Sequence, residues 1–164
     1  MIFALMWNGK MDDDLHSVEE RITSEFGQIF LQTQSFNVDY ARYYHREMGV
    51  GLHKKFVVVD TLIQKCEGVS IKKWAISLED HYSLRGNRTV NIDPVWLDEY
   101  QVVALSKKDR GSRICIGKGV YGEMELFYHH GSFHPFPWTY IDYKGNIRFF
   151  EEVRKIYLNK AREV

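Results

Sequence analysis

The sequence predicts an α+β fold with a mixed, mostly antiparallel sheet. The sheet begins with a ferredoxin-like split βαβ arrangement, is extended by C-terminal hairpins and is closed by a C-terminal helix. Three observations predict this class: two successive runs in the order strand, helix, strand, three further strand-like segments, and helical periodicity at the end of the chain. The chain has 164 residues, of which 45% are apolar and 27% charged. These values are typical of a globular protein, so we expect a single domain over residues 1–164.

The first strand, helix and strand lie between Ile2 and Phe36. Ile2 to Trp7 is an apolar run that predicts a buried strand, and apolar residues recur at helical spacing from Met11 to Phe26. Acidic residues in the first turn and Gly27 after the last turn mark the two ends of this helix. Ile29 to Phe36 has the composition of a second strand.

The second strand, helix and strand follow a short helical turn expected over Tyr40 to Met48. His53 to Asp60 predicts a central strand, because its middle is a continuous apolar run. The clearest helical spacing in the chain runs from Ile71 to Tyr82. Arg88 to Ile92 then closes the second unit as a strand.

The C-terminal part predicts hairpins followed by a helix. Gln101 to Ser106, Arg113 to Ile116 and Tyr121 to Tyr128 are expected to be strands that extend the sheet. Pro135 to Lys144 is expected to be an aromatic loop that either plugs the core or offers a stacking surface. Ile147 to Tyr157 has the spacing of a closing amphipathic helix.

Alternation along Tyr121 to Tyr128 divides its residues between two faces. We expect Gly122, Met124 and Leu126 on the core face and Glu123 and Glu125 on the solvent face. The alternative is that the two carboxylates share a metal or a cationic group, because they lie about 7 Å apart on a strand.

The charge balance argues against nucleic acid as a partner. Lysine plus arginine (22) equals aspartate plus glutamate (22), so no net field draws the chain to phosphate. Paired lysines such as Lys72 and Lys73 are expected at the solvated surface. The apolar start is too short for a membrane span and lacks a basic leader, so we expect a soluble, cytoplasmic protein with no membrane partner. Cys66 and Cys115 show no metal spacing and are expected to be reduced and buried.

Two motifs are weak candidates for chemistry. Gly111 to Gly119 resembles a phosphate-binding loop only superficially, because five residues separate Gly111 from Gly117 and a glycine follows Lys118. His129, His130 and His134 could supply imidazole ligands to a metal, but we favour a solvated turn for them.

The chain resembles a bacterial family defined as a domain of unknown function, DUF4416. The matching stretches, in order along the chain, are Phe26-Gly27, Tyr43 to Gly49, Val90 to Pro94, Arg113 to Glu123 and Pro137 to Tyr143. The resemblance implies no established fold, activity or catalytic residue. The chain departs from the family pattern at mostly polar positions, which implies that any site using them has diverged; these are Ala41, Arg42, Ala75, Ile76, Val95 and Ser112.

The leading hypothesis is a small-molecule-binding or metal-binding domain, with a divergent metal-assisted hydrolase or phosphoryl-transfer enzyme as its catalytic form. Aromatic walls with acidic and amide groups suit small polar ligands. The expected pocket residues are Tyr43, Glu47, Asn91, Asp93, Glu123, Trp138, Tyr140 and Asp142.

A divalent metal is the one cofactor considered, with Glu47, Asp93 and Glu123 as its candidate ligands. For Asp93, capping of a following turn is an equally weighted reading. No nucleophile and base pair stands out, so no catalytic residue is assigned. The alternative function is a non-enzymatic protein-interaction or homodimerisation domain built on the aromatic loops.

Overall fold

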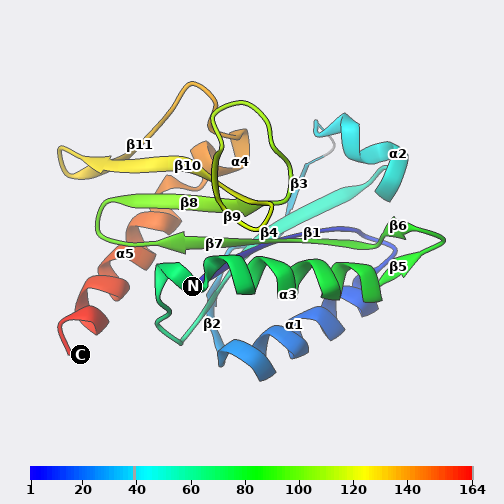
Figure 1. The fold of residues 1–164 in the computed structure, drawn as a ribbon, viewed down its shortest axis with the longest axis horizontal. Coiled ribbons are helices and arrows are strands. Elements are labelled where there is room, and N and C mark those ends of the chain that lie inside the picture. The colour runs from blue at the N-terminus through cyan, green and yellow to red at the C-terminus, as the bar shows by residue number, and fades with distance from the viewer. Residues whose placement is uncertain (39, 164) are drawn as a thin grey trace. The chain divides into compact units, whose positions relative to one another are not determined.

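The computed structural model describes residues 1–38 and 40–163 and has the predicted α+β class (Figure 1). The chain forms two compact units, Met1–Pro94 and Val95–Val164. The boundary between them falls inside strand β7 (Val90–Leu97). Each unit is described separately below.

Unit 1 contains the split βαβ arrangement. Its strands follow the order β7, β1, β4, β2, so β4 lies between the two strands of the first βαβ run, as predicted. β4 is antiparallel to both β1 and β2. The elements are β1 (Ile2–Asn8), α1 (Asp12–Phe26), β2 (Ile29–Gln32), β3 (Phe36–Asn37), η1 (Arg42–Tyr44), α2 (His45–Met48), β4 (Leu52–Val59), η2 (Lys65–Glu67), α3 (Gly68–His81), β5 (Ser83–Leu84), β6 (Asn87–Arg88) and the first part of β7.

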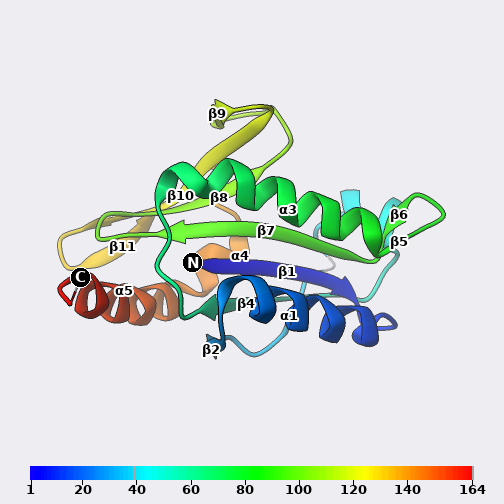
Figure 2. The same ribbon diagram turned by 60° about the horizontal axis from the view of Figure 1, so that its bottom comes forward.

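Helices α1 and α3 lie along the same face of these strands (Figures 1 and 2). Alternate residues of the strands, such as Phe3, Val57 and Ile92, point to this face and pack with Ile22 of α1 and Ala75 of α3. This alternation explains why both the strand pattern and the helical spacing are visible in the sequence.

The short helices η1 and α2 belong to a second apolar cluster. Met6, Val38, Met48 and Leu52 are buried together, and Tyr44 packs against them. Met6 alternates with the helix-facing residues of β1, so this cluster lies on the opposite face of the strand. Packing of Met48 therefore fixes the position of Tyr43, Tyr44 and Glu47 beside the sheet.

Unit 2 is an antiparallel meander with two helices. Its strands follow the order β11, β10, β8, β7, and β9 pairs with β10. Helix α5 packs against β11. The elements are the second part of β7, β8 (Gln101–Ser106), β9 (Ile114–Gly117), β10 (Val120–His129), β11 (Ser132–Pro135), α4 (Ile141–Gly145) and α5 (Ile147–Ala161).

Several boundaries differ from those predicted. The expected strand Ile29 to Phe36 is interrupted at residues 33–35. The Thr33 N–H still donates to the Phe56 carbonyl of β4 (3.0 Å), and strand pairing resumes at Phe36 in β3. Asn91, Asp93 and Pro94 do not end a strand, since β7 continues to Leu97. The expected aromatic loop contains α4 and is preceded by β11, whose pairing with β10 the sequence did not indicate.

The predicted faces of the strand Tyr121 to Tyr128 were wrong in its middle. Gly122 and Leu126 are buried, as predicted, but Glu123 and Glu125 are buried too and Met124 is 36% exposed. The register between β10 and β8 shifts between Met124 and Leu126, and this bulge breaks the simple alternation of side chains.

Two further predictions about burial were wrong. Cys66 and Cys115 are both exposed. Lys72 is buried, because α3 turns it toward the edge of β7 instead of solvent. Within residues 1–38 and 40–163, no helix is long and apolar enough to cross a membrane.

Candidate functional site

A buried network of charged side chains joins α2, α3 and β7 in unit 1. Its inner members are Lys72 and Glu79 of α3, which are almost completely buried. Its outer members are Glu47, Arg88, Asn91 and Asp93. Three of the four expected ligand residues of unit 1, Glu47, Asn91 and Asp93, are thus joined in one network, and the fourth, Tyr43, lies in η1 directly before α2.

The inner pair satisfies the backbone of β7 at its edge. β7 pairs with β8 from Val95 to Leu97. At Ile92 the backbone of β7 bonds instead to side chains of α3. The Ile92 N–H donates to Glu79 Oε1 (2.7 Å), and Lys72 Nζ donates to the Ile92 carbonyl (2.8 Å). Burying a backbone group without a partner is costly, so these two charged residues have a clear structural role.

The outer half of the network is organised by Arg88. Its Nε and Nη2 donate to the two carboxylate oxygens of Glu47, at 2.6 and 2.9 Å. Its Nη1 donates to Asn91 Oδ1 (2.6 Å) and reaches Glu79 Oε2 (3.3 Å). Such a bidentate pair fixes both position and orientation of the Glu47 carboxylate.

Asp93 accepts hydrogen bonds on both oxygens. Lys72 Nζ donates to Oδ1 and Asn91 Nδ2 donates to Oδ2, each at 2.8 Å. Burial by itself would raise the pKa of Asp93, but the charge and hydrogen bond of Lys72 and the amide of Asn91 lower it to about 2. Asp93 is therefore ionised at neutral pH and caps no helix.

Three carboxylates meet in the network. Glu47, Glu79 and Asp93 contact Lys72 and Arg88, and the charge of Lys54 also acts on Asp93. Burial raises the pKa of Glu79, with Asp93 adding to the effect and Lys72 opposing it. A pair of carboxylates whose pKa values are driven in opposite directions is typical of functional sites, although structural networks produce it too.

Two adjacent tyrosines border this network. The Tyr43 and Tyr44 rings lie 4.3 Å apart, and the Arg88 guanidinium lies 5.9 Å from the Tyr44 ring centre. Burial, followed by the charge of Asp93, raises the pKa of Tyr44, so its hydroxyl stays protonated. Tyr43 is half exposed.

The remaining four candidate residues lie in unit 2, where Arg113 joins two of them. Arg113 Nε donates to Glu123 Oε2 (2.8 Å) and Nη2 donates to the Tyr140 hydroxyl (3.1 Å). Ser112 donates to the other oxygen of Glu123 (2.8 Å). Both oxygens of Glu123 are therefore held by neighbours from the β9 side of the hairpin.

Trp138 and Asp142 have different surroundings. Trp138 is 44% exposed and stacks on Phe136, with ring centres 4.7 Å apart and planes at 7°. Asp142 is buried in the first turn of α4. Tyr143 is also buried and stacks on Phe150, so the segment both anchors α4 and leaves an aromatic pair on the surface.

The proposed metal ligands are each paired with a cation of the chain. Glu47 contacts Arg88, Asp93 contacts Lys72, and Glu123 contacts Arg113. In the described part of the chain, no group of three or more His, Cys, Asp or Glu side chains is arranged to hold a metal ion.

The charged partners were missed by sequence reasoning, but two left a signal. Lys72 and Glu79 are seven residues apart, which returns to the same helical face, and Ala75 of the core lies between them. Arg88 and Arg113 left no such signal. Each pairs with a carboxylate from another segment of the chain, and only the fold determines which one.

The comparisons with known proteins identify one family. The family model described as Domain of unknown function (DUF4416) matches residues 1–157. Searches of curated proteins and of solved structures found no match.

Proposed function

The chain belongs to the DUF4416 family, and on that premise we propose that it is a small-molecule-binding domain whose ligand carries a positive charge. The proposed site is the outer half of the ionic network, at Tyr43, Glu47, Asn91 and Asp93. The observation that carries the proposal is that two carboxylates of the network, those of Glu47 and Asp93, are partly exposed beside the half-exposed ring of Tyr43.

These two carboxylates are accessible from outside. The side chains of Glu47 and Asp93 are 31% and 28% exposed, whereas Lys72 and Glu79 are almost fully buried. Each carboxylate oxygen of Asp93 accepts one hydrogen bond and has a second lone pair to offer. The half-exposed ring of Tyr43 adds a surface to which a cation is attracted.

Binding should weaken in acid. Burial raises the pKa of Glu79, so this carboxylate takes up a proton at a higher pH than an exposed glutamate does. A bound cation favours the ionised form of Glu79. The affinity for a cation should therefore fall as the pH is lowered and Glu79 becomes protonated.

Metal-assisted hydrolysis or phosphoryl transfer is a narrower form of this proposal. It requires Glu47, Asp93 or Glu123 to exchange Arg88, Lys72 or Arg113 for a metal. Divalent metals are therefore included among the cations to be tested, and the proposal assigns no catalytic residue.

A thermal-shift screen of the full chain tests the proposal. The panel pairs primary amines and amino acids with neutral molecules of matched shape, and adds Mg²⁺, Mn²⁺, Ca²⁺ and Zn²⁺. A ligand at ~100 times its Kd adds about 2.7 kcal/mol of stability, which raises the midpoint by several degrees.

Variants locate the site. Asp93→Asn and Tyr43→Ala should remove the shift, whereas Asp80→Asn, which changes an exposed carboxylate of α3, should retain it. Because Tyr43 is half exposed, Tyr43→Ala should leave the fold intact. It therefore tests the site even where Asp93→Asn unfolds the chain. A panel without any shift, or one in which neutral molecules act as well as cations, contradicts the proposal.

A second candidate function is protein interaction or homodimerisation. The supporting observation is the exposed, stacked pair of Phe136 and Trp138 in unit 2. Tryptophan is enriched at the centres of protein interfaces. Light scattering should then give an assembly that Trp138→Ala dissociates, and a monomer at all concentrations counts against this function.

We also propose that the protein works in the bacterial cytoplasm. Cys66 and Cys115 are exposed and form no disulfide. Exposed thiols persist in reducing compartments and are oxidised outside them. Fractionation of the native host tests this location.

A further inference from the structure

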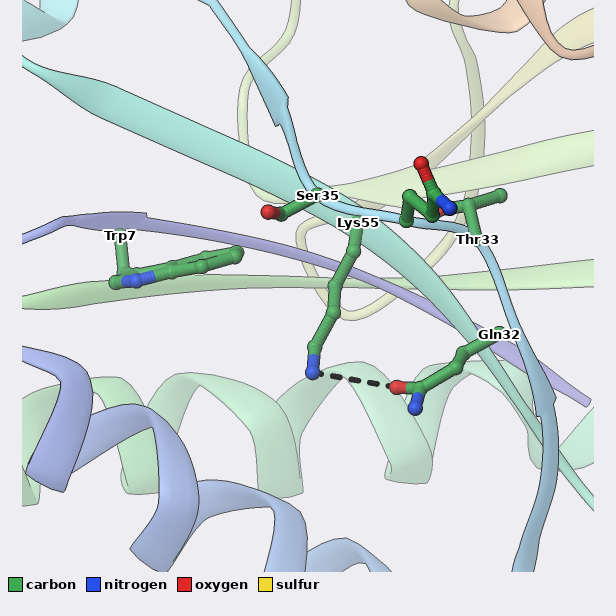
Figure 3. A pocket seen from close by; sticks show the side chains of 6 residues that line it. Trp7, Gln32, Thr33, Ser35 and Lys55 are labelled. Atoms are coloured by element: carbon green, nitrogen blue, oxygen red, sulfur yellow. Dashed lines mark hydrogen bonds between the residues drawn. The ribbon is translucent and has the colours of Figure 1, made fainter.

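A hollow on unit 1 lies apart from the ionic network and is lined by polar side chains and one indole. Its volume is about 350 Å³, and it is lined by Trp7, Gln32, Thr33, Gln34, Ser35 and Lys55. Figure 3 shows Lys55 extending from β4 to the amide of Gln32, with Trp7 across the opening from both. A volume at the lower end of the range for ligand pockets suits a small ligand.

The hollow lies where the edge of the sheet is interrupted. β2 and β3 both pair with β4, and residues 33–35 between them form no strand, although the Thr33 N–H still donates to the Phe56 carbonyl (3.0 Å). Lys55 is in phase with Val57 and Val59 on β4, so it points to the same face as the core.

The charges in the hollow are balanced. Lys55 Nζ lies 2.6 Å from Glu19 Oε1, and both side chains are mostly buried. A charged ligand would therefore compete with one member of this mostly buried pair for the other, which is unfavourable. The hollow favours a ligand without net charge.

Hydrogen-bond donors remain available beside this pair. Lys55 has three N–H donors, and the described residues accept two of them, at Glu19 and at Gln32 Oε1 (3.2 Å). Thr33 Oγ1 accepts from the Phe56 N–H, which leaves its own hydrogen to donate. The amide nitrogen of Gln32 and the hydroxyl of Ser35 add further donors.

The indole supplies a small apolar surface. Trp7 packs in the core of unit 1 and is 5% exposed, and its Nε1 donates to Asp12 Oδ1 (2.8 Å), so the hollow meets only a few carbon atoms of the ring. The ammonium of Lys55 lies 6.0 Å from the ring centre. A ligand that fits must combine several hydrogen-bonding oxygens with C–H groups.

From this combination we propose that the hollow binds a small neutral ligand rich in hydroxyl groups, of the monosaccharide or polyol class. A hydroxyl group both accepts from Lys55, Thr33 or Gln32 and donates to Glu19. A C–H group of the ligand contacts the small exposed part of Trp7. A second hollow of about 480 Å³ shares Gln32 and runs along α1, so one end of the ligand faces open space.

A nuclear magnetic resonance titration of the ¹⁵N-labelled full chain tests the proposal. The probes are neutral monosaccharides and polyols, each hexose paired with its uronic acid. We expect at least one neutral probe to move the Trp7 indole N–H signal and the Gln32 amide signals to saturation, and its uronic acid to bind more weakly.

Lys55→Met should weaken this binding by about tenfold, the effect of losing one hydrogen bond from a charged donor. Lys54→Met is the matched control, because the neighbouring residue of β4 points to the opposite face and should leave binding unchanged. Ser35→Ala should also weaken binding, and Ser35 is exposed, so the fold is retained.

Three results would overturn the proposal. They are no saturable shift with any neutral probe, tighter binding of the uronic acid than of the hexose, or unchanged binding in both Lys55→Met and Ser35→Ala. Since Asp93 and Glu47 do not line this hollow, Asp93→Asn should leave sugar binding intact, which separates the test from that of the ionic network.

Discussion

Arg88 holds together more of the ionic network than any single carboxylate does. It contacts Glu47, Glu79 and Asn91, and Glu79 in turn contacts the backbone of Ile92. Sequence reasoning predicted that Glu47, Asn91 and Asp93 belong to one site, but it missed Arg88. An arginine beside a turn usually indicates a solvated surface, and only the fold brings α2 next to β6.

Replacing Arg88 should destabilise unit 1. Arg88→Met removes the bidentate partner of Glu47 and one of the two cations near Glu79, since Lys72 stays 4.0 Å from it. Breaking a buried pair costs about 3–5 kcal/mol, and because Glu47 is partly exposed, we expect the lower end of this range. Arg88→Lys should recover only part of the loss, since lysine cannot bind Glu47 through two nitrogens.

Urea denaturation measures these changes, with Arg46→Ala as the control. Arg46 is an exposed neighbour on α2, so its variant should change the free energy of unfolding by no more than about 0.5 kcal/mol. Equal stability of Arg88→Met and the unmodified chain would show that the network does not stabilise the fold.

Asp93 predicts how stability depends on pH in acid. Its folded-state pKa is lowered from 3.8 to about 2, so the unfolded state binds the proton more tightly. Stability from this group is complete above pH about 4 and is lost as the pH falls to about 2, a change of about 2 kcal/mol. In Asp93→Asn, the free energy of unfolding measured by urea titration should therefore fall less steeply between those pH values. An equally steep fall in both proteins would contradict the lowered pKa of Asp93.

At the scale of elements, the turn between α1 and β2 depends on Gly27. Its φ is +89°, and a Cβ there would lie 2.9 Å from Thr61 Oγ1. Gly27→Ala should therefore cost about 1–3 kcal/mol, from backbone strain and from this contact.

Gly145 provides the matched control for Gly27. It ends α4, its backbone has no positive φ, and a Cβ there meets nothing within 4 Å. Gly145→Ala should leave stability unchanged or raise it by up to about 1 kcal/mol, because alanine favours a helix. Thermal unfolding followed by circular dichroism measures both, and equal midpoints for the two variants would contradict the argument.

Elements with a strong period were predictable, and elements shaped by tertiary pairing were not. The helices α1, α3 and α5 and the strands β1 and β4 match their predicted segments within a few residues. The faces of β10 were wrong because a bulge shifts its register, and no residue between Met124 and Leu126 signals a bulge. Burial of Glu123 then depends on Arg113, which the hairpin brings across from β9.

At the scale of the whole molecule, β7 contributes to both units. Val90 and Ile92 belong to the core of unit 1, whereas Val95 and Leu97 pair with β8 in unit 2. A sequence without a linker predicted a single domain, and the family match covers residues 1–157 as one domain. We therefore expect the two units to unfold together.

Scanning calorimetry tests this cooperativity. One transition, with a calorimetric enthalpy equal to the van't Hoff enthalpy, is expected because neither unit can lose its part of β7 alone. Two resolved transitions would mean that each unit folds independently despite the shared strand.

The central claim is that the partly exposed carboxylates of the network, Glu47 and Asp93, attract a cationic ligand. The most direct test is isothermal titration calorimetry with the amine or metal that raises the midpoint most, at neutral pH and in acid. We predict that the affinity falls as the pH is lowered and that Asp93→Asn abolishes binding. Equal affinity of Asp93→Asn and the unmodified chain would contradict the claim.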